Sequence, residues 1–215
     1  MSWWENRVVP VMVEKMLSAG AVHKQRHAVC EGLSGEVLEV GFGSGLNVSH
    51  YPAAVTGIAA VEPSDRGWEM SRERRAISPL PYERIGLDGQ DIAADDASFD
   101  NALITFSLCT IPDPDRALRE VRRLLRPGGR LFFLEHGLSP VGTVATWQRR
   151  LDPIERRMAG GCELSRDIPA IVRRAGFEIG SLEEFDLPGP AAMRPWGHGF
   201  RGHASVSPAS ARETG

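Results

Sequence analysis

The sequence predicts an α/β fold with a doubly wound, mostly parallel sheet that helices cover on both faces. Short apolar runs, typical of buried parallel strands, recur along the first two thirds of the chain. Segments with helical periodicity lie between them, and this alternation favours a parallel sheet. A glycine-rich turn follows the first run, at the position where such folds bind ligands.

The elements follow in order along the chain. Residues 7–17 predict a helix, because apolar residues recur there as adjacent pairs four positions apart. Apolar runs predict four strands, at residues 36–40, 57–61, 101–105 and 130–134. Residues 114–125 predict a helix that Asp113 caps at its start and Pro127-Gly128-Gly129 ends.

The last third of the chain departs from this alternation. Residues 143–175 predict a longer helical region, and residues 177–185 and 197–206 predict two more strands. Residues 207–215 are small and polar, so we expect this terminal segment to be disordered.

Length and composition set the protein class. The 215 residues suffice for one domain with a substantial core. Cys30, Cys109 and Cys162 lie far apart, which is typical of free thiols in a reducing compartment, and we expect a cytoplasmic protein. The net charge of −3 provides no basic field for nucleic acid. We expect neither a secretory signal nor a transmembrane segment, since no stretch approaches the roughly 18 to 20 apolar residues of a membrane span.

The stretch LEVGFGSGLN, residues 38–47, points to a bound ligand. Its three glycines lie between the first strand and the next element, where backbone amides can approach a ligand. The dinucleotide fingerprint GxGxxG requires a glycine where this chain has Leu46, which disfavours a nicotinamide oxidoreductase. Glu62 ends the second strand, where an acid serves ribose hydroxyls in several nucleotide-binding folds.

Four blocks occur in a fixed order between residues 36 and 136. They are Glu39-x-Gly41-x-Gly43-x-Gly45, Val61-Glu62-Pro63-Ser64, Gly89-Gln90-Asp91-Ile92 before Ser98-Phe99-Asp100, and Leu124-Leu125-Arg126-Pro127-Gly128-Gly129. Together they resemble the class I S-adenosylmethionine-dependent methyltransferases. The resemblance implies the Rossmann-like, seven-stranded fold of that class. It divides the chain into an N-terminal helical cap at 1–34, a methyltransferase domain at 35–206 and a flexible tail at 207–215.

Three further stretches narrow the resemblance. They are Thr105-Phe106-Ser107-Leu108-Cys109, Glu135-His136 and Gly161-Cys162-Glu163-Leu164-Ser165-Arg166. In these the chain resembles the animal membrane-associated thiol methyltransferases of the methyltransferase-like group and their bacterial relatives. We expect this chain to lack the long apolar anchor with which the animal proteins start.

The resemblance implies S-adenosylmethionine as cofactor and S-adenosylhomocysteine as its product. Gly41 to Gly43 would lie under the methionine moiety, Glu62 would bind the ribose hydroxyls, Asp91 and Ile92 would flank the adenine, and residues 105–107 would border the sulfonium. A carboxylate that accepts two hydroxyl hydrogen bonds is a strong anchor. The implied cofactor-binding set is Glu39, Gly41, Phe42, Gly43, Asn47, Glu62, Pro63, Asp91, Ile92, Thr105, Phe106 and Ser107.

The expected acceptor is a small apolar molecule, with a thiol preferred. Because the thiolate is the nucleophile and a free thiol has a pKa of about 8.5, a nearby base would help. His136, just past the fifth strand, is the candidate catalytic base, and a histidine that only hydrogen-bonds a loop is the alternative. A quinone carbon or a lipid amine as acceptor stays open, as does a non-catalytic cofactor-binding module.

Other chemistry-bearing residues have simpler interpretations. Methyl transfer requires no protein thiol, so Cys109 is expected to be a small buried hydrophobe, whereas Cys162 falls in the region assigned to the acceptor. His23 and His27 share a helix face at a spacing that can bind zinc, but no partner ligand is visible in the sequence, so we expect no metal site.

Aromatic and apolar residues near the start admit three interpretations. Trp3, Trp4 and the stripe within residues 8–17 would form a lid over the cofactor, a weakly membrane-associated face, or plain packing on the domain. We expect packing with a partial lid function. Trp147 and Trp196 are candidates for the wall of an apolar acceptor pocket.

Overall fold

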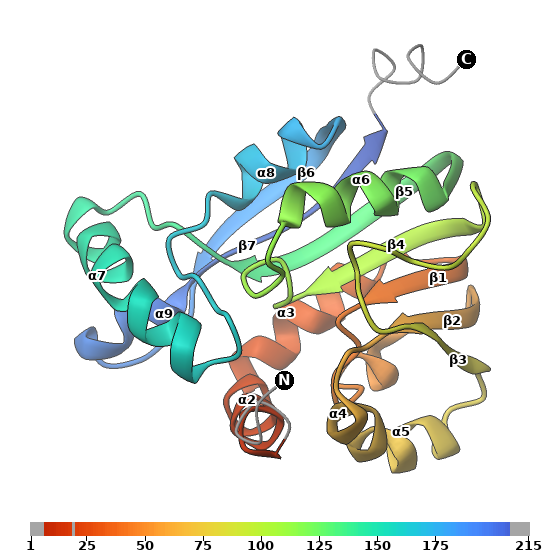
Figure 1. Cartoon of the computed structure of the whole chain (residues 1–215), viewed down its shortest axis with the longest axis horizontal. Coiled ribbons are helices and arrows are strands. Elements are labelled where there is room, and N and C mark those ends of the chain that lie inside the picture. The colour runs from red at the N-terminus through yellow and green to blue at the C-terminus, as the bar shows by residue number, and fades with distance from the viewer. Residues whose placement is uncertain (1–6, 19, 207–215) are drawn as a thin grey trace.

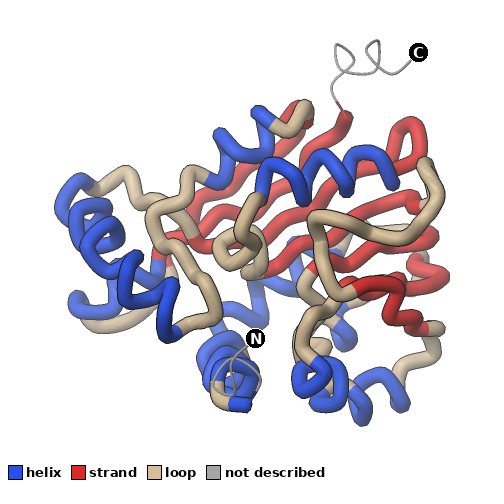
Figure 2. The backbone as a smooth tube through the Cα atoms, viewed as in Figure 1, coloured by secondary structure: helices blue, strands red, loops and turns tan. Residues whose placement is uncertain are grey.

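A seven-stranded sheet forms the centre of the protein, seen in a computed structural model that describes residues 7–18 and 20–206 (Figures 1 and 2). The strand order is β3-β2-β1-β4-β5-β7-β6, with parallel pairing from β3 to β5 and antiparallel pairing of β7 with both β5 and β6. The doubly wound, mostly parallel sheet predicted from the sequence is therefore confirmed. The strands are β1 (Gly35–Val40), β2 (Val55–Val61), β3 (Tyr82–Gly86), β4 (Phe99–Thr105), β5 (Leu125–His136), β6 (Phe177–Asp186) and β7 (His198–Val206).

Helices cover both faces of this sheet (Figure 1). One core packs α6 (Pro114–Leu124) and α8 (Ile168–Arg174) on one face, with side chains such as Leu118 and Val172 fully buried. The other core packs α3 (Gly20–Cys30) and Trp68 of α4 (Asp65–Met70) on the opposite face, around Val37 and Phe132. The remaining helical elements are α2 (Val9–Leu17), η1 (Val48–His50), α5 (Arg72–Ile77), α7 (Gly142–Met158), η2 (Ala191–Met193) and α9 (Arg194–Gly197).

The six predicted strands are present, and β3 is an additional one. Its sequence YERIG has no continuous apolar run, because β3 is an edge strand whose residues are partly or fully exposed. This strand forms by pairing with β2, and the pattern of apolar residues does not reveal it.

Two predicted helix boundaries differ from the structure. The helix at residues 114–125 ends at Leu124, because Leu125 is extended and pairs with Phe99, so Pro127-Gly128-Gly129 lies within β5. The helical region at 143–175 is broken between α7 and α8, where Gly160 and Gly161 both have positive φ angles.

The connections place β1 and β4 side by side at the centre of the sheet. From β1 the chain winds through β2 and β3 in one direction, and it then returns to build β4 and β5 in the other. In open α/β sheets the crevice at such a reversal point binds ligands at the carboxyl ends of the strands. The loops that follow Val40 and Thr105 meet there.

Some predicted features fall outside the described residues, namely Trp3, Trp4 and the tail at 207–215. Within the described part of the chain, no helix has the length and apolar character needed to cross a membrane.

Candidate active site

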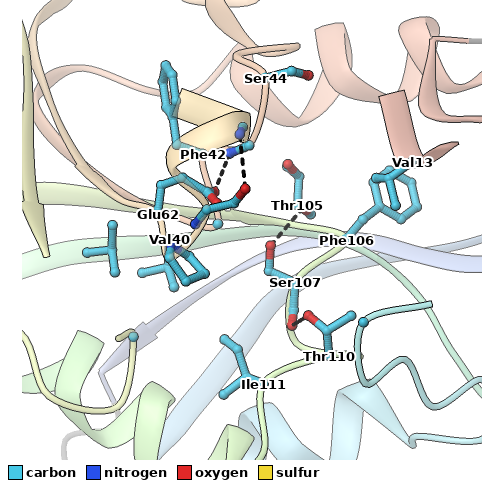
Figure 3. A pocket seen from close by; sticks show the side chains of 18 of the residues that line it. Val13, Val40, Phe42, Ser44, Glu62, Thr105, Phe106, Ser107, Thr110 and Ile111 are labelled. Carbon is cyan, nitrogen blue, oxygen red and sulfur yellow. Dashed lines mark hydrogen bonds between the residues drawn. The ribbon is translucent and has the colours of Figure 1, made fainter. Parts of the chain in front are cut away.

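A cavity of about 550 Å³ opens at the carboxyl edge of the sheet where β1 and β4 lie side by side (Figure 3). Its volume lies in the range typical of small-molecule sites, about 300–1,000 Å³. Its lining comes from the loops after β1, β2, β3 and β4, from the helices α2 and α3, and from the turn after α7. The cavity is lined by Val9, Val13, Glu14, Leu17, Arg26, Val40, Gly41, Phe42, Gly43, Ser44, Leu46, Val61, Glu62, Pro63, Ser64, Gly67, Leu87, Asp88, Gly89, Gln90, Thr105, Phe106, Ser107, Thr110, Ile111, Pro112, Ala159 and Gly160.

The glycine-rich loop presents bare backbone to this cavity. Gly41 and Gly43 have φ angles of +79° and +57°, which side-chain-bearing residues rarely adopt. A Cβ on Gly41 would lie 1.8 Å from the hydroxyl oxygen of Ser107, so the loops after β1 and β4 are in direct contact. The loop therefore offers a cradle in which a ligand can approach the main chain.

Glu62 fixes the shape of this loop from the end of β2. Its carboxylate is buried and accepts hydrogen bonds from the amides of Gly43, at 2.6 Å, and Ser64, at 2.7 Å (Figure 3). Burial raises the pKa of Glu62, although the two amide hydrogen bonds oppose that rise. Each carboxylate oxygen has a second lone pair, so Glu62 retains the capacity to accept hydrogen bonds from ligand hydroxyls.

A buried polar network lies beneath the loop. Arg26 of α3 donates from Nη1 to Asn47 Oδ1 at 2.8 Å and to Thr105 Oγ1 at 3.0 Å. Asn47 donates to Glu39 at 2.8 Å, and the Tyr51 hydroxyl donates to the other oxygen of Glu39. Burial raises the pKa of Glu39 to about 7, against the lowering effect of these two hydrogen bonds. The network couples the ends of β1 and β4 to α3.

Arg26 is the cation of this network, and it also lines the cavity. It is only 4% exposed, and its Nε has no hydrogen-bond partner in the described part of the chain. Its guanidinium lies 5.3 Å from the ring centroid of Phe106. A buried cation with an unused donor beside a cavity is suited to an anionic ligand group.

The loop after β4 is held by Glu135. Phe106 has a φ of +53°, and the following amides, of Ser107 and Leu108, donate to Glu135 Oε1 at 2.8 and 3.1 Å. Burial raises the pKa of Glu135 to about 7. A non-glycine residue in this conformation costs free energy, so the clamp by Glu135 maintains the backbone that borders the cavity.

His136 lies outside the cavity lining, against two cysteines. Its Nε2 is 3.2 Å from Cys162 Sγ, and its ring centroid is 6.4 Å from that of Phe106, which does line the cavity. Hydrogen bonds from Cys109 and His136 lower the pKa of Cys162 to about 5, although burial opposes them. Burial alone would lower the pKa of His136, but the interaction with Cys162 raises it. The predicted base His136 therefore lies behind Phe106 and not in the lining of the cavity, and its catalytic role stays a prediction.

The helix α2 lies over the cavity. Val9, Val13 and Leu17 contribute apolar lining from one face of the predicted stripe. Glu14, on the same helix, accepts hydrogen bonds from Ser44 of the glycine loop and from Arg74 of α5, the latter at 2.6 Å. The described part of the predicted stripe therefore packs over the cavity, and its partial lid function stays a prediction.

The structure divides the predicted cofactor-binding residues into two groups. Gly41, Phe42, Gly43, Glu62, Pro63, Thr105, Phe106 and Ser107 line the cavity. Glu39 and Asn47 lie behind them in the buried network, Asp91 is exposed outside the lining, and Ile92 belongs to the core of the sheet. The residues before them, Asp88, Gly89 and Gln90, line the cavity instead.

Sequence reasoning missed Arg26 altogether. It is one basic residue in a helical segment with no motif, and its contact with Thr105 joins positions 79 residues apart. Trp147 is 55% exposed and Trp196 packs beside the cysteines, so neither walls the cavity. His23 and His27 are exposed near a third histidine, His50, with ring centroids 4.2 and 5.9 Å from it.

Comparisons with known proteins identify the family of the chain. A family model described as a methyltransferase domain matches residues 38–133. The chain is 35% identical to thiol S-methyltransferase TMT1B of Rattus norvegicus over 182 residues, which cover 81% of this chain and 72% of that protein. It is 30% identical to phosphatidylethanolamine N-methyltransferase of Cereibacter sphaeroides over 131 residues, 58% of this chain and 62% of that protein.

The fold has matching solved structures. An S-adenosylmethionine-dependent methyltransferase of Thermotoga maritima superimposes with a TM-score of 0.66 at 21% identity, over 94% of this chain and 99% of that one. Fold, glycine loop and family match together define the class: the chain is an S-adenosylmethionine-dependent methyltransferase. Within that class it belongs to the family that includes the thiol S-methyltransferases. The alternatives of a nicotinamide oxidoreductase and a non-catalytic module are set aside.

Proposed function

We propose that this methyltransferase transfers a methyl group from S-adenosylmethionine to the sulfur of a small apolar thiol. The observation that carries the proposal is the apolar wall of the cavity opposite the glycine loop, in a chain 35% identical to a thiol S-methyltransferase. Val13 of α2 and Phe106 and Ile111 after β4 make up this wall (Figure 3). Such a wall favours an apolar acceptor and keeps water away from the reacting atoms.

The donor fits along the glycine loop. Gly41 to Gly43 offer main-chain contact to its amino-acid part, and the Glu62 carboxylate has the acceptor capacity for two ribose hydroxyls. Asp88, Gly89 and Gln90 line the next part of the cavity, which supports an adenine site there, directly before the predicted Asp91 in the sequence. When bound, the cofactor supplies a methyl group that is already activated on a sulfonium.

We assign the carboxylate of the donor to Arg26. The guanidinium lines the cavity beside Thr105, and its Nε has no hydrogen-bond partner among the described residues. A positive charge at this place would repel a sulfonium but would pair with a carboxylate, so the amino-acid end of the donor is oriented toward α3. This orientation would leave the sulfonium and its methyl group nearer to Phe106 and Ser107 than to the guanidinium.

The chemical demand on the protein is modest. The acceptor would react as a thiolate after its proton has passed to solvent, its sulfur would bond to the methyl carbon as the methyl–sulfonium bond breaks, and a methyl thioether and S-adenosylhomocysteine would result. Holding the three atoms in line lowers the barrier by converting a bimolecular step into one within the site. The clamped loop after β4 and the α2 lid provide this positioning.

The test is an acceptor screen with labelled S-adenosylmethionine. Alkyl and aryl thiols should give methyl thioethers, while phenols, quinones and amines turn over at least about tenfold more slowly, a difference of about 1.4 kcal/mol in barrier. Faster methylation of phosphatidylethanolamine or of a quinone would overturn the thiol assignment and favour the lipid-like acceptor instead. Calorimetric titration with the cofactor, run in parallel, shows whether the donor site is intact in each preparation.

A further inference from the structure

Two cysteines and a histidine converge behind the wall of the cavity. Cys109 lies in the loop after β4, His136 ends β5 and Cys162 follows α7, so three separate segments supply them. Their ligand atoms all lie within 4.8 Å of one another, with His136 Nε2 and Cys162 Sγ 3.2 Å apart. None of the three lines the cavity, and the methyl transfer proposed above uses none of them.

The backbone that presents these side chains is well anchored. Positive φ angles at Gly160 and Gly161 turn the chain back after α7, so that Cys162 faces the β4 loop. The Glu163 amide then donates to the carbonyl of Cys109 at 2.9 Å, and Arg166 donates to the carbonyl of Ile111 at 2.7 Å. The two cysteine loops are thus joined to each other by hydrogen bonds.

The surroundings of the three side chains are apolar. Cys109 is 2% exposed and Cys162 is 7% exposed, and both pack with the fully buried Leu164. Leu151, Ala159 and Trp196 complete the apolar shell. An apolar shell around metal ligands limits solvent access and lowers the local dielectric constant.

We propose that Cys109, His136 and Cys162 bind one Zn²⁺ ion. Zinc bonds of about 2.3 Å to sulfur and about 2.0–2.1 Å to nitrogen place tetrahedral ligand atoms roughly 3.5–3.8 Å apart. The three atoms of this cluster need only small side-chain shifts to reach that spacing, given their mutual distances within 4.8 Å. Two thiolates and an imidazole form the soft donor set that selects zinc over magnesium or calcium.

The site supplies three protein ligands and leaves one position for a solvent molecule. Among the described residues, the cluster contains no fourth cysteine, histidine or carboxylate. Two thiolates neutralise the charge of the ion, so the complex is compatible with a buried position. Zinc would then join the loop after β4, which borders the cavity, to the loop after α7.

The experiment measures metal content and cobalt spectra of the full chain. Protein purified under reducing conditions and dialysed against zinc-free buffer should retain about one zinc ion per chain. Cys109→Ala and Cys162→Ala should each lower zinc affinity by at least about 100-fold, because even the loss of an outer-shell partner costs 10–100-fold. Cys30→Ala, at a buried cysteine elsewhere, and His27→Ala, at an exposed histidine, should leave the stoichiometry unchanged.

A second readout needs no variant. Cobalt added to metal-free wild-type protein should give the thiolate-to-cobalt charge-transfer absorption and the intense visible bands of a tetrahedral site. Zinc content far below one per chain together with a cobalt spectrum lacking the charge-transfer absorption would overturn the proposal. Equal zinc binding by wild type and Cys162→Ala, or loss of zinc in His27→Ala alone, would do the same.

Discussion

Gly41 and Ser107 are in contact across the cavity floor, so close that a Cβ on the glycine would lie 1.8 Å from the serine hydroxyl oxygen and 2.6 Å from its Cβ. The glycine follows β1 and the serine follows β4, so their contact joins the two loops at the reversal point of the sheet. The backbone conformation of one loop therefore constrains the other, and both border the cavity.

Gly41→Ala should lower the free energy of unfolding and weaken cofactor binding. The left-handed conformation costs a side-chain-bearing residue about 1–2 kcal/mol, and the contact with Ser107 adds to it. Urea unfolding and calorimetry with S-adenosylmethionine measure the two effects. The double variant Gly41→Ala/Ser107→Gly should recover only the part of the loss that comes from the clash with Ser107.

Gly142→Ala is the control, because a Cβ added at Gly142 would have no neighbour within 4 Å among the described residues. A loss of equal size in Gly142→Ala would contradict the explanation.

Glu62→Gln should raise the dissociation constant for S-adenosylmethionine by about tenfold to a hundredfold. The change keeps the size of the side chain but removes the charge to which the amides of Gly43 and Ser64 donate and to which the ribose hydroxyls are proposed to donate. Hydrogen bonds to charged groups contribute about 1.5–3 kcal/mol. Calorimetric titration measures the change. Glu83→Gln, at an exposed position of β3, should bind as the wild type does. An unchanged affinity in Glu62→Gln would refute its role.

Arg26→Met should weaken the binding of ligands that carry an amino-acid end and leave the binding of ligands without one almost unchanged. Affinity for S-adenosylhomocysteine should fall by at least about tenfold, since a charge-assisted bond is lost, while affinity for methylthioadenosine, which has no carboxylate, should stay within about twofold. Isothermal titration of both ligands gives the ratio. The exposed Arg119→Met on α6 is the matched control. An equal loss for both ligands would assign Arg26 to the fold alone.

Glu39 should make the protein less stable as the pH rises. Burial raises the pKa of this carboxyl in the folded protein from about 4.5 to about 7, so the protonated form favours folding. Its stabilising contribution is complete below about pH 4.5 and is lost as the pH rises through about 7.

The measurement compares urea unfolding of the wild type and Glu39→Gln across that pH window. The difference between the two unfolding free energies should change by about 3 kcal/mol in total, at about 1.36 kcal/mol per pKa unit. Glu178→Gln, at an exposed position of β6, should follow the wild-type curve. Parallel curves for wild type and Glu39→Gln would show that this carboxyl does not titrate in the window.

Much of the fold follows from local pattern. Runs of buried apolar residues such as Val37 and Leu38 mark the central strands, and the stripe of Leu118 and Val121 marks α6. The sequence pattern does not reveal the edge strand β3, because its residues are partly exposed and show no clear alternation of buried and exposed side chains. The predicted end of α6 lies one residue too late, because Leu125 pairs with Phe99 in the sheet and does not continue the helix.

The sequence by itself determined the class of the protein and the places of the glycine loop and Glu62, because these lie at the ends of consecutive strands. Tertiary structure decided which residues share a site. Arg26 meets Thr105 from 79 positions away, and Cys109, His136 and Cys162 come from three segments. The physical reason is that hydrogen bonds along one element have a short, regular spacing in sequence, whereas contacts between elements depend on how the sheet and its helices pack.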